Sequence, residues 1–396
     1  MSDKLFEECQ ENAVSWCVDL IRINSENPPG SEKECAEYCC RILESLGMET
    51  VLDEFEPGRA NVIAYIGNRD KIGIVFNGHL DVVPAEGDWT DPPFGGSIHD
   101  GCIWGRGSAD MKSGCAAVMA AAKYCICSGM DFSQKGMVLT FVADEENVNK
   151  GSIRLSKAIP LSGDACIVAE PTGLEVNYGN RGFTSYYVRT RGKACHACDP
   201  GKGENAIYKM AGVIQKLKDF AEELECRKNP QLGTMTMSVG MIRGGTSLNM
   251  VPDFCEIEVE ARVFPGTDAV TISRELEKLL GDEAEVVIRS NLLASLVPED
   301  SDLVKNAAAC VEKAVGQKAV IGKFPACSEA SFFSVGYRIP TILLGPGNIQ
   351  TAHKPDEFVP LSDIRKAVEI YSNMIKIYCG KRQKGEMCHE QSGRKN

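Results

Sequence analysis

Residues 136–146 read GMVLTFVADEE, and the fold of the surrounding chain follows from this stretch. The six residues 137–142 contain a single hydroxyl, which predicts a strand buried on both faces. Three carboxylates, those of Asp144, Glu145 and Glu146, follow where that strand leaves the sheet. A solvated acidic turn would explain the triplet. A metal site would also explain it, because a divalent cation turns repulsion between carboxylates into attraction.

Length and composition set the first limits. The chain has 396 residues, more than one core usually holds, and 43% of them are hydrophobic, so we expect two domains. A formal net charge of −12 argues against a nucleic-acid-binding surface. Residues 1–24 lack the basic start and apolar core of a signal peptide, and no run of about 18 apolar residues occurs. We therefore expect a cytoplasmic protein with no membrane partner and no nucleic-acid partner.

Cysteine is frequent, with 18 residues, but in the absence of an export signal most are expected to be free thiols in the core. Cys195 and Cys198 form a C-x-x-C pair that leaves open a structural zinc site or a redox disulfide. A structural zinc site normally needs a second ligand pair at a recognisable spacing, and the chain has no other C-x-x-C. A cysteine-based site is therefore the weaker alternative.

The first part of the chain alternates helical and strand patterns. A turn at Asn27-Pro28-Pro29-Gly30 separates two amphipathic helices, and Ser31 with Glu34 fits a capping box for the second. The helices expected here cover residues 5–23, 31–46 and 113–127. The strands expected here cover residues 50–55, 61–66, 72–78, 137–142 and 165–169.

Candidate metal ligands stand at the ends of these elements. His79 follows a central strand, and the carboxylate of Asp81 can accept the second imidazole N–H and fix the tautomer that binds a metal. Asp110 lies in a glycine-rich entry to a helix, and Glu170 follows another strand. Ligands of open α/β sheets bind outside the carboxyl ends of the strands, so these residues are expected to lie beside the acidic triplet.

From about residue 181 the pattern changes to strand, helix, two strands, helix and strand. This order is that of a split ferredoxin-like α+β domain inserted into the first domain. The elements expected in it cover residues 183–191, 204–224, 235–242, 254–263, 268–280 and 284–289. The chain then returns to helices at 302–315, 329–335 and 362–378 and a strand at 341–344.

We therefore divide the chain at residues 180 and 292. Residues 1–180 and 293–380 form one α/β domain, and residues 181–292 form the inserted domain. Residues 381–396 are polar and are expected to be a disordered tail.

Histidine is rare, with five residues, and His353 lies in the glycine-rich and acidic segment before the last helix. Two histidines with several carboxylates supply the nitrogen and oxygen ligands that suit zinc, with manganese or cobalt as substitutes. Combining His79 and His353 with the carboxylates predicts a two-metal hydrolase.

At this point the chain resembles the di-zinc exopeptidases and deacylases, which include acetylornithine deacetylase, succinyl-diaminopimelate desuccinylase, aminoacylase and glutamate carboxypeptidase. The segments that carry the resemblance are GHLDVVP, GRGSADMKSG, ADEE, AEPT, GGTSLNMVP and GPGNIQTAHKPDE, in family order over about residues 5–380. The resemblance implies a zinc-exopeptidase-like α/β catalytic domain. The inserted ferredoxin-like domain would be a lid and dimerisation domain.

The resemblance also implies the metal ligands. Asp110 would bridge two zinc ions, with His79 and Glu170 completing one site. Glu146 and His353 would complete the other. The peptide bond between Asp110 and Met111 would be cis.

Further roles are implied for residues beside the metals. Glu145 would be the general base, and Asp81 would orient the metal-binding histidine of its own segment. In the inserted domain, His196 would reach the active site of the partner subunit and stabilise the oxyanion. Asn249 and Arg262 would hold the carboxylate of the substrate.

The resemblance thus implies a homodimeric zinc hydrolase that cleaves the amide bond of an N-acyl amino acid. Cys327-Ser328-Glu329-Ala330 resembles the Thr-Glu-Ala of deacetylases more than the Thr-Ser-Asp of desuccinylases, which favours a deacetylase-like substrate. One alternative is a dipeptidase or carboxypeptidase of the same family. A catalytically silent binding module is another, and the complete ligand set with Glu145 argues against it.

Overall fold

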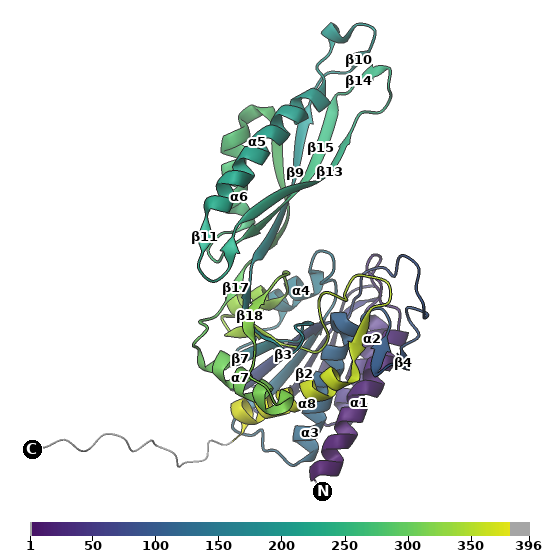
Figure 1. Cartoon of the computed structure of the whole chain (residues 1–396), viewed down its shortest axis with the longest axis vertical. Coiled ribbons are helices and arrows are strands. Elements are labelled where there is room, and N and C mark those ends of the chain that lie inside the picture. The colour runs from purple at the N-terminus through teal and green to yellow at the C-terminus, as the bar shows by residue number, and fades with distance from the viewer. Residues whose placement is uncertain (1, 381–396) are drawn as a thin grey trace, which may run out of the picture.

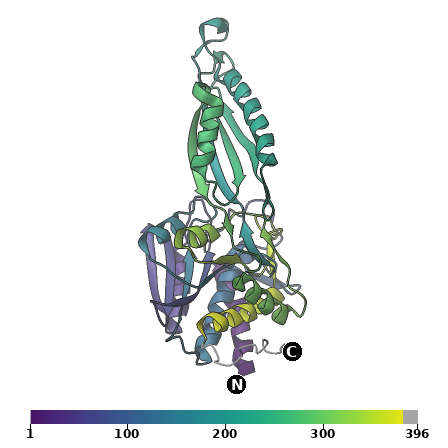
Figure 2. The ribbon, with the colours of Figure 1, turned by 90° about the vertical axis from the view of Figure 1, so that its left-hand side faces the viewer.

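The computed structural model describes residues 2–380, which form two lobes. The small lobe stands above the large one in Figure 1, and the view turned by 90° in Figure 2 shows the same elongated arrangement. The tail at 381–396 lies outside the described residues, so its expected disorder stays a prediction. No helix within residues 2–380 combines the length and apolar character that a membrane span requires.

The large lobe is built on a nine-stranded mixed sheet. Its strands are β1 (Glu49–Glu56), β2 (Arg59–Ile66), β3 (Ile72–His79), β6 (Gly136–Val142), β7 (Ala165–Val168), β8 (Val176–Asn180), β17 (Ser295–Leu296), β18 (Ile321–Phe324) and β19 (Thr341–Leu343). Their order is β1-β2-β6-β3-β7-β19-β8-β17, with β18 paired to β8. The central strands β6, β3, β7 and β19 run parallel, and β3 and β6 are buried along their whole length, as their apolar sequences predict.

Helices cover both faces of this sheet. One face packs against five helices: α1 (Ser2–Arg22), α2 (Lys33–Ser45), α3 (Ser113–Cys127), α7 (Asp302–Val315) and α8 (Leu361–Cys379). The other face packs against α4 (Lys150–Ala158) and the segment η4 (Phe332–Tyr337). Two apolar layers therefore enclose the central strands, and the polar groups at their carboxyl ends lie together at one edge.

A three-stranded sheet lies beside the large one. It contains β4 (Ser97–His99), β5 (Cys102–Trp104) and β20 (Phe358–Pro360), in the order β20-β5-β4. The Asp-Gly turn between β4 and β5 agrees with the hairpin that this dipeptide favours.

The small lobe has a four-stranded antiparallel sheet in the order β13-β15-β9-β16. Its strands are β9 (Gly182–Arg191), β13 (Thr236–Gly244), β15 (Phe254–Val263) and β16 (Glu285–Leu292). The helices α5 (Ala206–Cys226) and α6 (Ala269–Leu280) pack on one face of it and form a separate core. The predicted ferredoxin-like arrangement is thus confirmed.

Short strand pairs occupy the ends of the small lobe. The pair β10 (Cys195–His196) and β14 (Met250–Val251) lies at the end far from the large sheet (Figure 1). The pair β11 (Lys228–Asn229) and β12 (Gly233–Thr234) forms a further turn. The far end carries His196, which matters for the site described below.

Two adjacent links join the lobes. The strand β8 runs into β9, and β16 returns into β17, and the same two segments pair antiparallel on both sides of the junction. Leu292 pairs with Phe183 above it, and Ser295 pairs with Asn180 below it. At Gly182 a Cβ atom would lie 2.7 Å from the main-chain oxygen of Leu292. The lobes are therefore joined by a closely packed ribbon of two strands.

Some local predictions were wrong. Helix α2 begins at Lys33 without a side-chain cap, and Ser31 Oγ donates to the Asn24 carbonyl instead of capping. The helix expected at 329–335 is present, but it spans residues 330–337 and most of it is the π-helical segment η4. The elements α4, β8, β17 and β18 were not predicted from the sequence, because they are short and are held by contacts with distant parts of the chain.

Candidate metal centre

The three carboxylates after β6 do not all point the same way. Asp144 has a left-handed backbone conformation (φ 71°), which Asp tolerates better than most residues. Its Oδ1 atom accepts hydrogen bonds from Arg59 Nη2 at 2.7 Å and Asn27 Nδ2 at 2.9 Å. Asp144 is therefore tied to a buried cation, and the turn leaves Glu145 and Glu146 facing the cavity.

Asp81 holds this turn in place. Its Oδ1 and Oδ2 atoms each lie 3.1 Å from a backbone nitrogen, the first from that of Glu145 and the second from that of Glu146. This differs from the predicted contact with His79, because His79 Nδ1 lies 2.9 Å from the Asp81 main-chain oxygen and 3.8 Å from its Oδ1. The main chain of Asp81 thus fixes the imidazole, and its carboxylate positions the two glutamates.

Asp110 lies between two histidines. Its Oδ1 is 3.0 Å from His79 Nε2, and its Oδ2 is 3.4 Å from His353 Nε2. His353 Nε2 also lies 3.0 Å from Glu146 Oε1. The Asp110–Met111 peptide bond is cis, as predicted.

A buried ion pair holds Asp110 from behind. Glu357 Oε1 accepts the backbone N–H groups of Ala109 at 2.8 Å and Asp110 at 3.1 Å. Glu357 Oε2 accepts a hydrogen bond from Arg106 Nη1 at 2.6 Å, and both side chains are almost fully buried. Nothing in the sequence alone indicated this pairing, although Arg106 lies within GRGSADMKSG and Glu357 within GPGNIQTAHKPDE.

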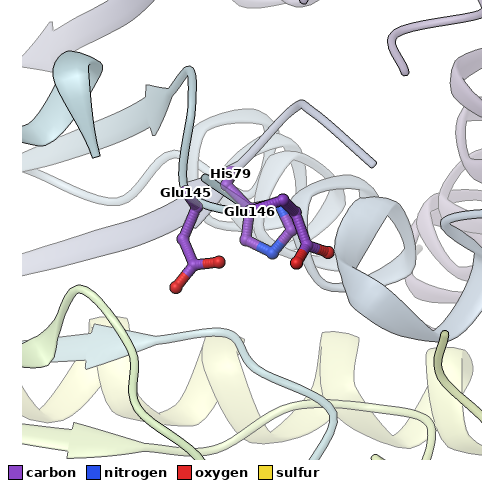
Figure 3. Close-up of side chains that lie close together, drawn as sticks. All are labelled: His79, Glu145 and Glu146. Carbon is purple, nitrogen blue, oxygen red and sulfur yellow. The ribbon is translucent and has the colours of Figure 1, made fainter. Parts of the chain in front are cut away.

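Side-chain donors meet in groups that could hold metal ions. His79, Asp110 and Glu170 place one ligand atom each within 4.8 Å of one another, and so do Asp110, Glu146 and His353. These two groups share Asp110, which suits a pair of metal ions bridged by one carboxylate. A third group contains Glu145 with His79 and Glu146 and omits Asp110 (Figure 3).

Burial and crowding shift the pKa values of the residues in this cluster. Burial raises the pKa values of Glu145 and Glu170 well above the usual range, and nearby carboxylates add to the effect. Burial opposes the charged form of His79, but the hydrogen bond and charge of Asp110 outweigh it and raise that pKa. The carboxylates of Asp110 and Glu146, which accept hydrogen bonds from the imidazole, raise the pKa of His353 to about 10. Divalent cations would satisfy the oxygens of these crowded carboxylates, so the donors of the cluster fit a metal pair.

A cavity of about 490 Å³ opens in front of these residues, with walls from both lobes. Arg262 lies against Cys327, a wall residue, where its guanidinium partly offsets the rise that burial causes in the pKa of that thiol. The guanidinium carbon lies 4.8 Å from the ring centroid of Phe183, another wall residue. The structure therefore brings Arg262 beside the cavity.

Glu329 lies deeper and is completely buried. It accepts hydrogen bonds from Asn77 Nδ2 at 2.8 Å and Ser152 Oγ at 3.1 Å, and burial raises its pKa to about 7. It thus connects β3 to α4 beneath the cluster. From the sequence, Glu329 indicates only a deacetylase-like substrate, and this buried position could not be predicted.

His196 and Asn249 are not brought to the cluster within one chain. Both are exposed at the far end of the small lobe, where β10 and β14 lie (Figure 1). His196 Nδ1 accepts the Cys198 N–H at 3.2 Å, and Asn249 Oδ1 lies 2.5 Å from Ser247 Oγ.

The thiols beside His196 form no metal group of their own. Among the described residues, the groups that could hold a metal include neither Cys195 nor Cys198, and both are free thiols. This counts against the structural-zinc and disulfide alternatives for the C-x-x-C pair.

Known proteins are similar to this chain in sequence and in fold. A family profile described as Peptidase family M20/M25/M40 matches residues 75–377. An acetylornithine deacetylase from Pectobacterium carotovorum is 32% identical over 337 residues, which cover 81% of this chain and 83% of the relative.

Solved structures share the fold. A metallo-carboxypeptidase from Sulfolobus solfataricus has a TM-score of 0.78 at 20% identity, covering 93% of this chain and 99% of its own. A dinuclear metal-binding peptidase from Bacillus subtilis has a TM-score of 0.67 at 14% identity, covering 94% of this chain and 98% of its own. The chain therefore belongs to peptidase family M20/M25/M40, and it is a metal-dependent hydrolase of amide bonds.

Proposed function

We propose that this hydrolase is a zinc-dependent deacylase that cleaves N-acyl amino acids into a carboxylate and a free amino acid. The observation that carries the proposal is the placement of Asp110 between His79 and His353 in a cavity rich in carboxylates. The name of the curated relative, an acetylornithine deacetylase, supports deacylation as the reaction.

The two groups that share Asp110 divide the metal ligands. His79 and Glu170 would complete one zinc site, and Glu146 and His353 would complete the other. Imidazole nitrogen and carboxylate oxygen suit zinc, with cobalt or manganese as substitutes. Bound zinc supplies Lewis acidity and lowers the pKa of water.

Glu145 is the proposed general base. Its carboxylate makes no hydrogen bond to the described residues, whereas Glu146 is engaged by His353. A base needs an oxygen free to take a proton, and burial has already raised the pKa of Glu145. Glu145 would take a proton from the attacking water and return it to the leaving amine.

Arg262 is the proposed anchor for the substrate carboxylate. Its guanidinium lies beside the cavity, against the wall residues Phe183 and Cys327. An arginine can bind a carboxylate through two parallel hydrogen bonds, which fixes the orientation of the amide. Asp81 would act by positioning Glu145 and Glu146 through their N–H groups.

The oxyanion donor is proposed to come from a second subunit. His196 and Asn249 lie at the exposed end of the small lobe, so they could complete a site only on another copy of the chain. We propose a homodimer in the cytoplasm, with residues 181–292 as its lid and dimerisation domain. The edge strand β13, whose outer half is exposed, would be available for pairing with its copy.

A screen of N-acetyl amino acids, N-succinyl amino acids and dipeptides with zinc present tests the reaction. We expect turnover of the N-acetyl substrates and loss of turnover on chelation. The alternative is a carboxypeptidase or dipeptidase, which the similarity to the Sulfolobus metallo-carboxypeptidase favours at the level of the fold. Hydrolysis of dipeptides alone would establish that alternative and reject deacylation.

A further inference from the structure

Beyond the metal cluster the walls of the cavity are mainly apolar. Side chains from both lobes form them, and the large apolar ones are Ile153, Phe183, Ile288, Phe324, Phe332 and Ile349. The polar lining residues outside the cluster are Asn147, Asn149, Arg289, Ser290 and Asn291. The large lobe contributes aromatic rings from two separate segments, and the small lobe contributes Phe183 and Ile288 from β9 and β16. The side chain of a substrate bound at the metal cluster would leave water and contact this apolar surface.

The charges that line the cavity are divided unevenly. Its acidic residues are those of the cluster itself, namely Asp110, Glu145, Glu146 and Glu170. Each of these four has an assigned role as metal ligand or base, so among the described lining residues no carboxylate is left for a cationic substrate side chain. The cationic lining residue outside the cluster is Arg289, whose Nη1 lies 3.6 Å from Glu258 Oε2, and it offers no attraction for such a side chain.

We infer that the substrates are N-acyl amino acids with neutral, apolar side chains, and that a cationic ornithine side chain is disfavoured. This inference rests on the proposed deacylase function and narrows it. The inferred preference differs from that of the relative, whose name, acetylornithine deacetylase, states an ornithine substrate. A buried ammonium group without a carboxylate partner loses hydration that the neutral amide oxygens of Asn147 and Asn149 replace only in part, whereas a methyl group gains from burial.

A matched pair of substrates isolates the ammonium group. The side chains of norvaline and ornithine share three carbons, and ornithine adds a terminal ammonium. We expect the kcat/KM of the zinc-loaded enzyme for N-acetyl-L-norvaline to exceed that for N-acetyl-L-ornithine by at least about 10-fold, which corresponds to about 1.4 kcal/mol. N-acetyl-L-glutamate is included because Arg289 could attract an anionic side chain.

A wall variant tests where the side chain lies. Ile153 is 37% exposed and lies in the first turn of α4, where a carboxylate is compatible with the helix dipole. Ile153→Asp adds a partner for ammonium, and Ile153→Asn is its uncharged control of similar shape. We expect the ratio of ornithine to norvaline turnover to rise by at least about 10-fold in Ile153→Asp relative to Ile153→Asn.

The outcomes are distinct. Equal or faster turnover of the ornithine or glutamate substrate by the parent enzyme would overturn the inference and leave the deacylase function intact. Hydrolysis of dipeptides with none of the N-acetyl substrates would reject the deacylase function as well. Identical ratios in the two Ile153 variants would overturn the placement of the side chain against this wall.

Discussion

Glu145 and Glu146 are neighbours in the chain that differ in their contacts. Glu146 contacts His353 and belongs to a group with Asp110, whereas Glu145 does neither. We expect Glu145→Ala to keep two zinc ions per chain and lose about 100- to 10,000-fold in kcat, the usual contribution of a general base. Glu146→Ala should bind less zinc. Elemental analysis with steady-state kinetics measures both, and clearly reduced zinc in Glu145→Ala would reverse the two assignments.

Titration of the metal-free protein should reveal the crowded cluster. The pKa values of Glu145 and Glu170 are raised, and that of His353 rises from 6.5 to about 10, so the native state binds more protons than the unfolded chain. Its free energy of unfolding should therefore fall as pH rises from about 4.5 towards 10, with each group contributing at most about 1.4 kcal/mol per pH unit. Zinc should remove most of this dependence.

Urea unfolding at pH 5.5 and pH 8.5, after chelation and with zinc restored, measures the effect. His353→Gln provides the control, because it removes one of the groups with a raised pKa. We expect a smaller fall between the two pH values in this variant than in the parent. A metal-free parent that is equally stable at both pH values would contradict the assigned protonation.

The sequence predicted which residues meet in the cluster. It did not predict the hydrogen-bond partners that hold each of them in place. The carboxyl ends of parallel strands meet at one edge, so His79 and Glu170 could be expected to converge. The acceptor for His79 could not be predicted, because a side-chain carboxylate and a main-chain carbonyl of Asp81 satisfy the same spacing. The pairing of Arg59 with Asp144 joins residues 85 positions apart and leaves no periodic signal.

At the scale of elements, the ion pair of Arg106 and Glu357 joins the entry of α3 to the segment before β20. Arg106→Met would leave the Glu357 carboxylate buried without its cation, which costs about 3–5 kcal/mol. We expect lower free energy of unfolding and weaker zinc binding, because Glu357 also holds the N–H of Asp110. Urea unfolding and zinc titration measure the two effects.

An exposed arginine pair supplies the control. Arg365 Nε lies 2.9 Å from Glu11 Oε1, but both side chains are substantially exposed. Arg365→Met should therefore lower the free energy of unfolding by less than about 1 kcal/mol. Equal unfolding midpoints for the Arg106 and Arg365 variants would show that the buried pair has no special part in holding Asp110.

Elements with long apolar runs were predicted well, and short ones were not. The apolar helix α3 and the buried strands β3 and β6 follow from their own sequences. The short strand β17 has two residues and exists because β8 lies beside it. Such elements depend on tertiary contacts, which a local pattern does not contain.

At the scale of the whole molecule, the proposed dimer predicts complementation. A mixture of Glu145→Ala and His196→Ala, each nearly inactive alone, would form heterodimers with one site carrying both defects and one carrying neither. With random exchange we expect activity to recover to about a quarter of the parent value. Activity and proof of exchange by mass spectrometry are the measurements.

Homodimers of each variant, mixed without exchange, are the control. Recovery that stays absent after proven exchange would show that His196 serves its own chain or has no catalytic part. The sequence of one chain could not place His196 relative to the cluster, since that distance depends on a second copy.

The two-stranded ribbon at Gly182 joins the lobes on either side of the cavity. Its walls belong to different lobes, with Phe183 and Ile288 on one side and Ile153 on the other, so the bend of the joint sets the gap between them. Gly182→Ala forces a backbone shift there, and we expect an altered ratio of kcat/KM between N-acetyl-glycine and N-acetyl-phenylalanine with zinc content unchanged. Gly212→Ala, whose Cβ meets nothing within 4 Å, should keep the parent ratio. The same ratio in both variants would contradict this control of width. If the two ratios differ, the range of substrate sizes is set in part at Gly182, which does not itself line the cavity, so a change there could alter selectivity while every metal ligand is kept.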